Sequence, residues 1–352
     1  MARTTNTIGL SRDLIIHPGE TLAELLEDRE MSQRELAIRT GVTEKHISTV
    51  ISGYKNISPV FARRLEYALG IKASFWMDLQ ANYDRELLLS EEINSISDEE
   101  LAVLDNLKEV TSLWTSWGWI QKSKDPNSYV LDYRLMLGIS NLLDTPKIFS
   151  SAAQRVLIEN SKADPYVLLA WQRMCEILTR DITSSKEVDT EKLRSKIANI
   201  KKTMFLDPDK IPDKLCAIFK ECGITFRTVP TLNGAPVRGF IKKTGSGSII
   251  LCIPVKDEYT DLFWFSLFRE IAHIINEDTK REYIDCGISS DRTEKKADKA
   301  AFDYLIDNKD YKVFIENEEF LQPHGIKTFA ESQKVREFIV RRKLINSGLI
   351  SE

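Results

Sequence analysis

Residues 269–273 read R-E-I-A-H, so that Glu270 comes three residues before His273 and an arginine comes four residues before it. When two histidines four residues apart flank such a glutamate on a helix, both imidazoles bind zinc from one face and the glutamate activates the metal-bound water. Position 269 is Arg269 instead, and a guanidinium has donors only and no lone pair for a metal. The stretch keeps part of a zinc-hydrolase pattern and lacks its first ligand.

Two helices must position these groups. On a helical wheel of residues 262–277 the apolar side chains occupy one side, and the polar ones fall within an arc of about 120°. This polar stripe comprises Ser266, Arg269, Glu270, His273, Asn276 and Glu277. A surface helix would show the same stripe, although this segment is unusually aromatic for one.

The second helix is predicted in R-T-E-K-K-A-D-K-A-A-F-D-Y-L, where Glu294 and Asp298 lie one turn apart. We expect Asp298 to lie on the inward side of that helix, where a carboxylate needs a polar partner. His273 is the expected partner, because carboxylates orient ligand histidines. His324 and Cys286 are the spare nitrogen and sulfur donors nearby in the sequence.

Three β-rich runs precede these helices, at residues 223–230, 237–243 and 248–255, and turn residues separate them. The turn T-G-S-G-S looks superficially like a phosphate loop. No G-K-[S/T] follows it, and its spacing fits a hairpin better than a nucleotide site.

The run F-W-F-S-L-F-R-E-I-A-H-I-I-N-E-D, followed by T-E-K-K-A-D-K-A-A-F-D-Y-L-I, resembles the ImmA/IrrE family of gluzincin-type metallopeptidases. The resemblance extends from about residue 223 to the C-terminus. It implies Glu270 as general base, His273 as second zinc ligand, Glu294 as third ligand and Asp298 as the carboxylate that supports it.

Because the first ligand is missing, we expect a pseudo-metallopeptidase without a cofactor, in which zinc appears only if the degenerate site still binds metal. Arg269 would replace the metal electrostatically by pairing with Glu294 or Glu270. The expected degenerate pocket comprises Arg269, Glu270, His273, Glu294 and Asp298. An active zinc metallopeptidase is the alternative.

The first 89 residues predict short helices separated by strong stop signals. In S-Q-R-E-L-A-I-R-T-G, Ser32 and Glu35 form a capping box, and Gly41 ends a helix about two turns long. Thr43 then caps another helix, which stops near Gly53. Two short helices joined by a tight turn containing glycine form a helix-turn-helix unit.

The second helix of this unit predicts a DNA-reading face. Its apolar residues share one side and must pack inward, so its polar residues point outward, as a helix in the major groove requires. The start of the preceding helix suits a phosphate contact, and the following loop suits a contact with the DNA backbone. The candidate DNA-binding residues are Gln33, Arg34, Thr43, Lys45, His46, Ser48, Thr49, Ser52, Tyr54, Lys55 and Asn56. A helical interaction module with a solvated face would show the same pattern.

Residues 16–84, from I-H-P-G-E through T-G-V to F-W-M-D-L-Q-A-N-Y-D, resemble the HigA/VapI branch of the XRE-type helix-turn-helix family, the antitoxins of addiction modules. The resemblance implies a five-helix domain, a homodimer on a palindromic operator in its own promoter, and a cognate toxin as partner. The first 89 residues carry 11 Lys and Arg against 12 Asp and Glu, so we expect a single domain to bind weakly and dimerisation to supply affinity.

The composition suits a soluble protein with several domains. The 352 residues are 42% hydrophobic and 29% charged, and a net charge of -4 argues against a broad polyanion binder. The apolar runs are strand-sized, and the N-terminus lacks the apolar core of a signal peptide, so we expect a cytoplasmic protein without a membrane span. Five cysteines without a C-x-x-C motif suit reduced thiols.

These signals predict a mainly α chain with a small α+β C-terminal domain. We expect a helix-turn-helix domain at 1–89, a helical middle region at 90–204 and a zincin-type domain at 205–352. In the middle region, Trp114, Trp117 and Trp119 are expected to pack in a core rather than to stack on bases. A stripe of Leu193, Ile197 and Ile200 is expected to pack on a neighbouring domain or subunit.

The expected function is a sequence-specific DNA-binding antitoxin and transcriptional autorepressor whose C-terminal domain binds or senses a ligand. Besides the active peptidase, a phage or mobile-element regulator without a toxin stays open.

Overall fold

The computed structural model describes residues 15–149, 162–256, 258–277, 282–285 and 292–351. The chain is mainly helical, as predicted, and forms two compact units. The first comprises residues up to Leu101 together with Ser123–Leu131, and the second comprises Ala102–Lys122 and the chain from Asp132 onward. The expected domain boundaries after residues 89 and 204 stay predictions. Within the described part of the chain, no helix is both long and apolar enough to cross a bilayer.

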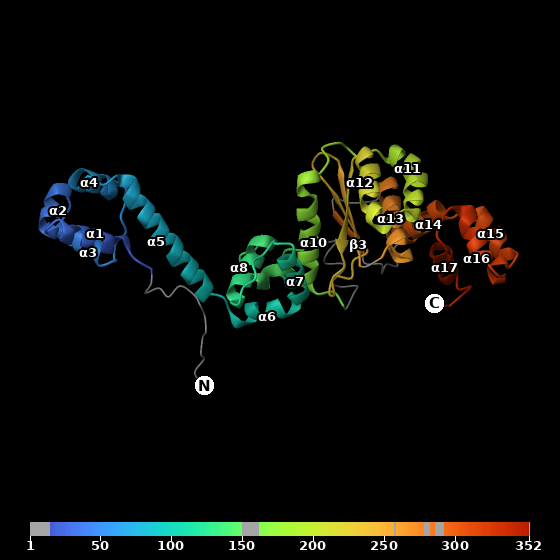
Figure 1. Cartoon of the computed structure of the whole chain (residues 1–352), viewed down its shortest axis with the longest axis horizontal. Helices are drawn as coiled ribbons and strands as arrows, with labels where there is room; N and C mark the ends of the chain where they lie inside the picture. Colours follow the sequence, from blue (N-terminus) through green and yellow to red (C-terminus); the bar gives the residue numbers. More distant parts are fainter. Residues whose placement is uncertain (1–14, 150–161, 257, 278–281, 286–291, 352) are drawn as a thin grey trace, which may run out of the picture. The chain divides into compact units, whose positions relative to one another are not determined.

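The first unit begins with short helices and a longer one (Figure 1). They are α1 Pro18–Asp28, α2 Gln33–Thr40, α3 Glu44–Ile51, α4 Pro59–Leu69 and α5 Ala73–Asn94. The Ser32 half of the predicted capping box is confirmed, since Ser32 Oγ accepts from the Glu35 N–H at 3.1 Å, and Gly41 ends the helix with φ 65° as predicted. The Glu35 carboxylate, the other half of the predicted box, accepts from Arg39. Thr43 caps α3 by accepting from the His46 N–H at 3.1 Å.

Each of these five helices contributes a buried side chain to a common core. Leu22, Leu36, Ile47, Phe61 and Trp76 are at most 2% exposed. Burying one such side chain stabilises a fold by about 1.5–3 kcal/mol, so short helices that would be marginal alone are held by one another.

In the rest of the chain, a run of helices precedes three strands, and further helices with one more strand follow them. The helices before the sheet are α6 Asp98–Asn106, α7 Lys108–Ser116, α8 Pro126–Leu137, α10 Pro165–Thr179, α11 Thr190–Lys202 and α12 Ile211–Glu221. Those after β3 are α13 Asp261–Ile275, α14 Arg292–Leu305, α15 Asn308–Glu316, α16 Gly325–Gln333 and α17 Glu337–Asn346. Short 3-10 segments lie at Leu142–Lys147, Arg180–Ile182, Thr203–Phe205, Pro208–Lys210 and Glu319–Leu321.

The sheet of the second unit has the strand order β1-β3-β2-β4. Its strands are β1 Ile224–Pro230, β2 Gly239–Lys243, β3 Ile249–Val255 and β4 Glu282–Asp285. β1 runs parallel to β3, whereas β2 is antiparallel to both β3 and β4. The three predicted strands and the hairpin between β2 and β3 are confirmed, and β4 has no counterpart in the sequence prediction.

Helices cover both faces of this sheet (Figure 1). On one face, the Trp171 ring of α10 meets the Phe240 ring edge-on, and its Nε1–H donates to the Pro230 carbonyl at 2.9 Å. On the other face, Ile241, Leu251 and Ile253 join the core cluster that α13 fills. Since α13 packs directly on β2 and β3, its position is fixed by the sheet.

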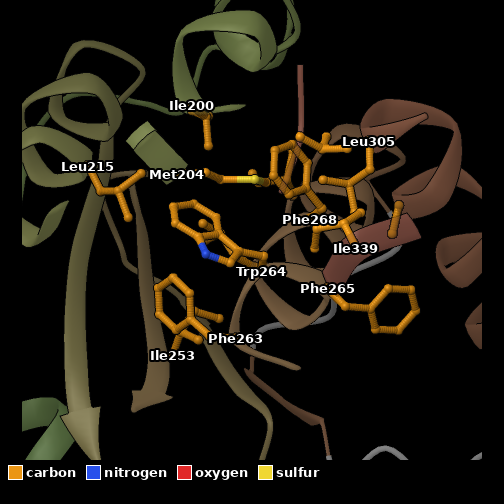
Figure 2. Packing of buried hydrophobic residues seen from close by; sticks show 14 of the residues in the cluster. Ile200, Met204, Leu215, Ile253, Phe263, Trp264, Phe265, Phe268, Leu305 and Ile339 are labelled. Atoms are coloured by element: carbon orange, nitrogen blue, oxygen red, sulfur yellow. The ribbon is translucent and has the colours of Figure 1, made fainter. Parts of the chain in front are cut away.

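The core around α13 draws on most elements of the second unit. Figure 2 shows Phe263, Trp264 and Phe268 of α13 among apolar side chains from other helices and from β3. Those labelled partners are Ile200, Met204, Leu215, Ile253, Leu305 and Ile339. The whole segment from Phe263 to Ile275 is buried, so the polar stripe from Ser266 to His273 faces the protein interior, whereas Glu277 at its end is exposed.

The stripe of Leu193, Ile197 and Ile200 packs on a core as expected, and of the three tryptophans the expected core packing is confirmed for Trp114. Leu193 and Ile200 are fully buried in the core of the second unit, and Ile197 packs partly buried against it. Trp114 is also fully buried and packs near Tyr133, with 5.2 Å between ring centroids. The indole of Trp117, in contrast, is 36% exposed.

Candidate functional site

The recognition helix α3 presents a short polar face to solvent. Ile47 and Val50 are fully buried and fix the orientation of the helix against the core of the first unit. Lys45, Ser48 and Ser52 are exposed on the remaining surface. A helix of this kind can place an ammonium and two hydroxyls against base edges and phosphates, which is the chemistry of major-groove recognition.

Two candidate residues on α3 lie closer to the core than the sequence analysis expected. His46 is half-buried, and its ring lies 4.9 Å from the Phe61 ring between centroids. Burial, followed by the positive charges of Lys55 and Arg64, lowers the pKa of His46. Thr49 is half-buried as well, and its hydroxyl donates to the His46 carbonyl at 2.8 Å.

The other candidate residues border α3. Gln33 is the half-buried first residue of α2, and Arg34 beside it is exposed. In the loop after α3, Lys55 Nζ lies 3.1 Å from His46 Nδ1. The Asn56 amide in the same loop donates to Asp84 of α5 at 3.3 Å, which ties the loop to the helix core. Tyr54 is 88% exposed and makes the loop an accessible contact surface.

The structure also shows what the residues of the motif I-H-P-G-E do. In the sequence this motif served only as part of a family resemblance. His17 caps α1, because its Nδ1 accepts from the Gly19 N–H at 2.9 Å. An added Cβ at Gly19 would overlap the carbonyl oxygen of Val50, so only glycine lets α1 approach the end of α3 this closely. The His17 ring also meets Tyr83 of α5 edge-on. These residues hold α3 in place, and only their three-dimensional contacts reveal it.

A further support holds the turn of the helix-turn-helix unit. Arg64 of α4 donates from Nη1 to the Gly41 carbonyl at 3.1 Å, across the turn between α2 and α3. Arg64 and Gly41 lie 23 positions apart in the sequence, so no local sequence pattern indicates the contact.

The second candidate site is a group of buried charges between α13 and α14. Arg269, which is 3% exposed, donates from Nη2 to Glu294, which is also 3% exposed. Arg269 Nη1 lies 3.3 Å from Asp298 Oδ1, and His273 Nε2 lies 3.4 Å from Glu294 Oε2. One guanidinium therefore faces two carboxylates, and Glu294 meets both Arg269 and His273.

The position of Glu294 follows from local structure. It lies in the first turn of α14, where the helix dipole favours a negative charge. Asp298 directs Oδ1 toward the buried Arg269, but its side chain is 41% exposed, which is more than the sequence expectation of an inward position implies. Helix α14 is amphipathic, and Asp298, one turn after the buried Glu294, lies at the boundary between the apolar and polar faces of the helix. The expected contact between Asp298 and His273 stays a prediction.

Glu270 is fully buried next to the sheet. An added Cβ at Gly239 of β2 would overlap the Glu270 carboxylate, so the acid lies directly on the strand backbone. No local sequence pattern indicates that Gly239 is part of the site. His324 lies outside the cluster as the N-cap of α16, and Cys286 lies outside the described residues.

Comparisons with known proteins concern the N-terminal part. Residues 22–76 match the family model described as Helix-turn-helix. A solved structure described as an antidote protein of a plasmid maintenance system from Nostoc punctiforme is 36% identical, with 22% of this chain and 84% of that chain covered and a TM-score of 0.21. An addiction module antidote protein of a HigA family from Coxiella burnetii is 31% identical, with 23% and 90% covered and a TM-score of 0.22.

The antitoxin GraA is 27% identical, with 24% of this chain and 95% of that chain covered and a TM-score of 0.22. A comparison with curated proteins found no match. The family match coincides with the segment in which α2 and α3 form the turn described above. Residues 22–76 therefore form a helix-turn-helix DNA-binding domain.

Proposed function

We propose that the chain is a sequence-specific DNA-binding regulator of the antitoxin type that represses its own promoter as a homodimer. Its second unit contains a degenerate metallopeptidase pocket that serves binding or sensing rather than catalysis. The exposed polar face of α3 within a helix-turn-helix domain carries the DNA-binding part of this proposal.

Charge and geometry define how the domain would bind. Lys45 is the cation on the exposed face of α3, and Lys55 and Arg34 border it. Three cations supply a modest phosphate-binding term, so specificity must come from base contacts by Lys45 and Ser48. A palindromic site read by two copies doubles the contacts, which is why a homodimer is part of the proposal.

Binding to a labelled duplex from the chain's own upstream region tests this assignment by fluorescence anisotropy. Replacing both Lys45 and Ser48 by Ala should weaken binding at least about tenfold, since one good base contact contributes about 1–3 kcal/mol. Lys72→Ala is the matched control, because Lys72 is an exposed lysine before α5. Equal binding of the double variant, or of a scrambled duplex, contradicts the proposal.

The antitoxin role is supported by the sequence resemblance of residues 16–84 to HigA/VapI antitoxins. It requires a toxin partner, so the tagged chain expressed with its neighbouring genes should co-purify with a small protein encoded beside it. If no toxin-sized reading frame adjoins the gene, the regulator without a toxin replaces the antitoxin.

The pseudo-metallopeptidase assignment rests on the fit of zinc to the buried charges. A catalytic zinc needs three protein ligands that present lone pairs to one point. Arg269 presents N–H donors there, and it pairs with Glu294, the carboxylate that the resemblance assigns as third ligand. The residues at this site therefore do not fit a catalytic zinc.

Metal analysis of the purified chain tests this second part. We expect the wild-type chain to contain no stoichiometric zinc after purification at neutral pH. Arg269→His is the matched variant, since it removes the guanidinium and restores a second imidazole one turn before His273; it should gain zinc. Stoichiometric zinc in the wild-type chain would establish the peptidase alternative.

A further inference from the structure

A cavity of about 540 Å³ lies in the second unit beside the start of α13. Its wall is mostly apolar, with Val237, Val255 and Phe263 among the residues that line it. This volume suits a small organic molecule, and an apolar wall with a few polar groups is the usual composition of a ligand site.

The charged residues in the cavity wall are mainly cationic. Arg238 and Lys256 line it, against one carboxylate, Glu258. Arg238 is half-buried, and within the described part of the chain no hydrogen bond or ion pair of its guanidinium is present. A half-buried guanidinium of this kind is ready to pair with an anion.

The first turn of α13 adds hydrogen-bond donors. Leu262 and Phe263, which line the cavity, lie in that turn, and the Thr260 side chain makes no capping hydrogen bond. The first backbone N–H groups of a helix lack intrahelical acceptors and favour a negative charge. Asp261 in the same turn is already engaged by Arg342, at 2.8 Å.

Ser266 is the independent sign of a ligand. Its side chain is 2% exposed and lines the cavity, and among the described residues it has no hydrogen-bond partner. A hydroxyl that opens on a cavity and has no protein partner is available to bond to a molecule that enters the cavity.

We propose that this cavity binds a small organic carboxylate with an apolar body. The carboxylate pairs with Arg238 and accepts hydrogen bonds from the first turn of α13, and the Ser266 hydroxyl bonds to a polar atom of the ligand. The apolar body lies against Val237, Val255 and Phe263.

The ligand would lie one helical turn from the buried charges. Ser266 precedes Arg269 and Glu270 by three and four residues, and therefore shares their face of α13. Arg238 directly precedes Gly239, against which the Glu270 carboxylate packs. This inference deepens the sensing role proposed for the second unit, because it names the chemical class that the unit would sense.

Ligand-observed NMR titrations of the full chain with hexanoate, hexanamide and inorganic phosphate test the proposal. Hexanoate should bind saturably, and both other probes should bind at least about tenfold more weakly, because hexanamide lacks the charge and phosphate lacks the apolar body. Absence of saturable hexanoate binding, or equal affinity for hexanoate and either other probe, overturns the proposal.

Variants locate the binding site. Arg238→Gln should weaken hexanoate binding about tenfold and leave hexanamide unchanged, and Ser266→Ala should weaken it about threefold. Arg341→Gln, an exposed arginine of α17, is the control and should bind hexanoate like the wild-type chain. Unchanged hexanoate affinity in Arg238→Gln, in a chain whose melting curve is unaltered, overturns the assignment of this cavity. DNA affinity and zinc content measured on the same samples report separately on the proposed function.

Discussion

Arg269 meets two carboxylates in the interior of the second unit, and it is the side chain whose removal has the largest expected effect there. With Arg269→Ala, Glu294 keeps its burial and loses its cation. Breaking one side of a buried ion pair costs about 3–5 kcal/mol, because a charge is left in a poorly solvated environment. We expect a loss of this size in the free energy of unfolding of the second unit, measured by urea denaturation.

Arg341→Ala is the control for that measurement, because Arg341 is exposed and such surface changes usually stay within about 0.5 kcal/mol. An unchanged denaturation midpoint in Arg269→Ala would show that the guanidinium does not balance the buried carboxylates.

His17 makes the stability of the first unit depend on pH. Its pKa is lowered from 6.5, mainly by burial, against opposing effects of Asn56, Glu20 and Asp84. Since the folded state binds the proton less well than the unfolded state, the stability that His17 contributes is present above about pH 6.5 and is lost as the pH falls through the lowered folded-state pKa. Protonation also removes the Nδ1 acceptor that caps α1.

His17→Asn tests this, because asparagine keeps a capping acceptor and does not titrate. Thermal melts between pH 7.5 and 5 should show a smaller loss of stability in this variant than in the wild-type chain. His46 also has a lowered pKa, so part of the acid sensitivity should persist. His324→Asn, in the second unit, should leave the acid sensitivity of the first unit intact.

At the scale of elements, the contact between α1 and α3 depends on Gly19. A methyl group there would overlap the Val50 carbonyl, and overpacking that moves backbone costs about 2–3 kcal/mol. We expect Gly19→Ala to lower both the stability of the first unit and its affinity for DNA, since α3 would shift. Circular dichroism and anisotropy measure the two effects.

Gly41→Ala separates this effect from a general intolerance of glycine replacement. Gly41 has φ 65° with open space around it, so alanine costs about 1 kcal/mol for the left-handed backbone and displaces no helix. If Gly19→Ala behaves like Gly41→Ala, the close approach of α1 to α3 has no energetic role.

Local signals in the sequence predicted local structure well. Ser32, Thr43 and Gly41 act within one helical turn, so their residue types alone indicate where α2 and α3 begin and end. The sequence could not place Arg64 on the Gly41 carbonyl or Gly239 against Glu270, because these contacts join residues far apart in the chain. The β4 strand was missed because four residues that pair with β2 carry too short a pattern.

The candidate sites show the same division. Residue types and spacing were sufficient to predict which face of α13 carries Arg269 and which face of α14 carries Glu294. They were insufficient to decide how deeply His46 and Asp298 are buried, since burial depends on how neighbouring elements cover a helix.

At the scale of the whole molecule, the two units have separate cores. The apolar cluster of the first unit spans Leu22 to Trp76 and that of the second spans Leu193 to Leu344, and among the described residues the two clusters share none. We therefore expect two transitions in differential scanning calorimetry. Gly19→Ala should move only one of them and Arg269→Ala only the other; a common shift would show that the units unfold as one.

The guanidinium of Arg269 also bears on whether the second unit needs a metal ion from the cell. A zinc ion must be acquired from a pool that rises and falls with nutrient supply, and a domain that needs it folds only when that pool permits. Arg269 is supplied with every copy of the chain by translation itself. The cation that faces Glu294 and Asp298 is therefore present as soon as the polypeptide is made.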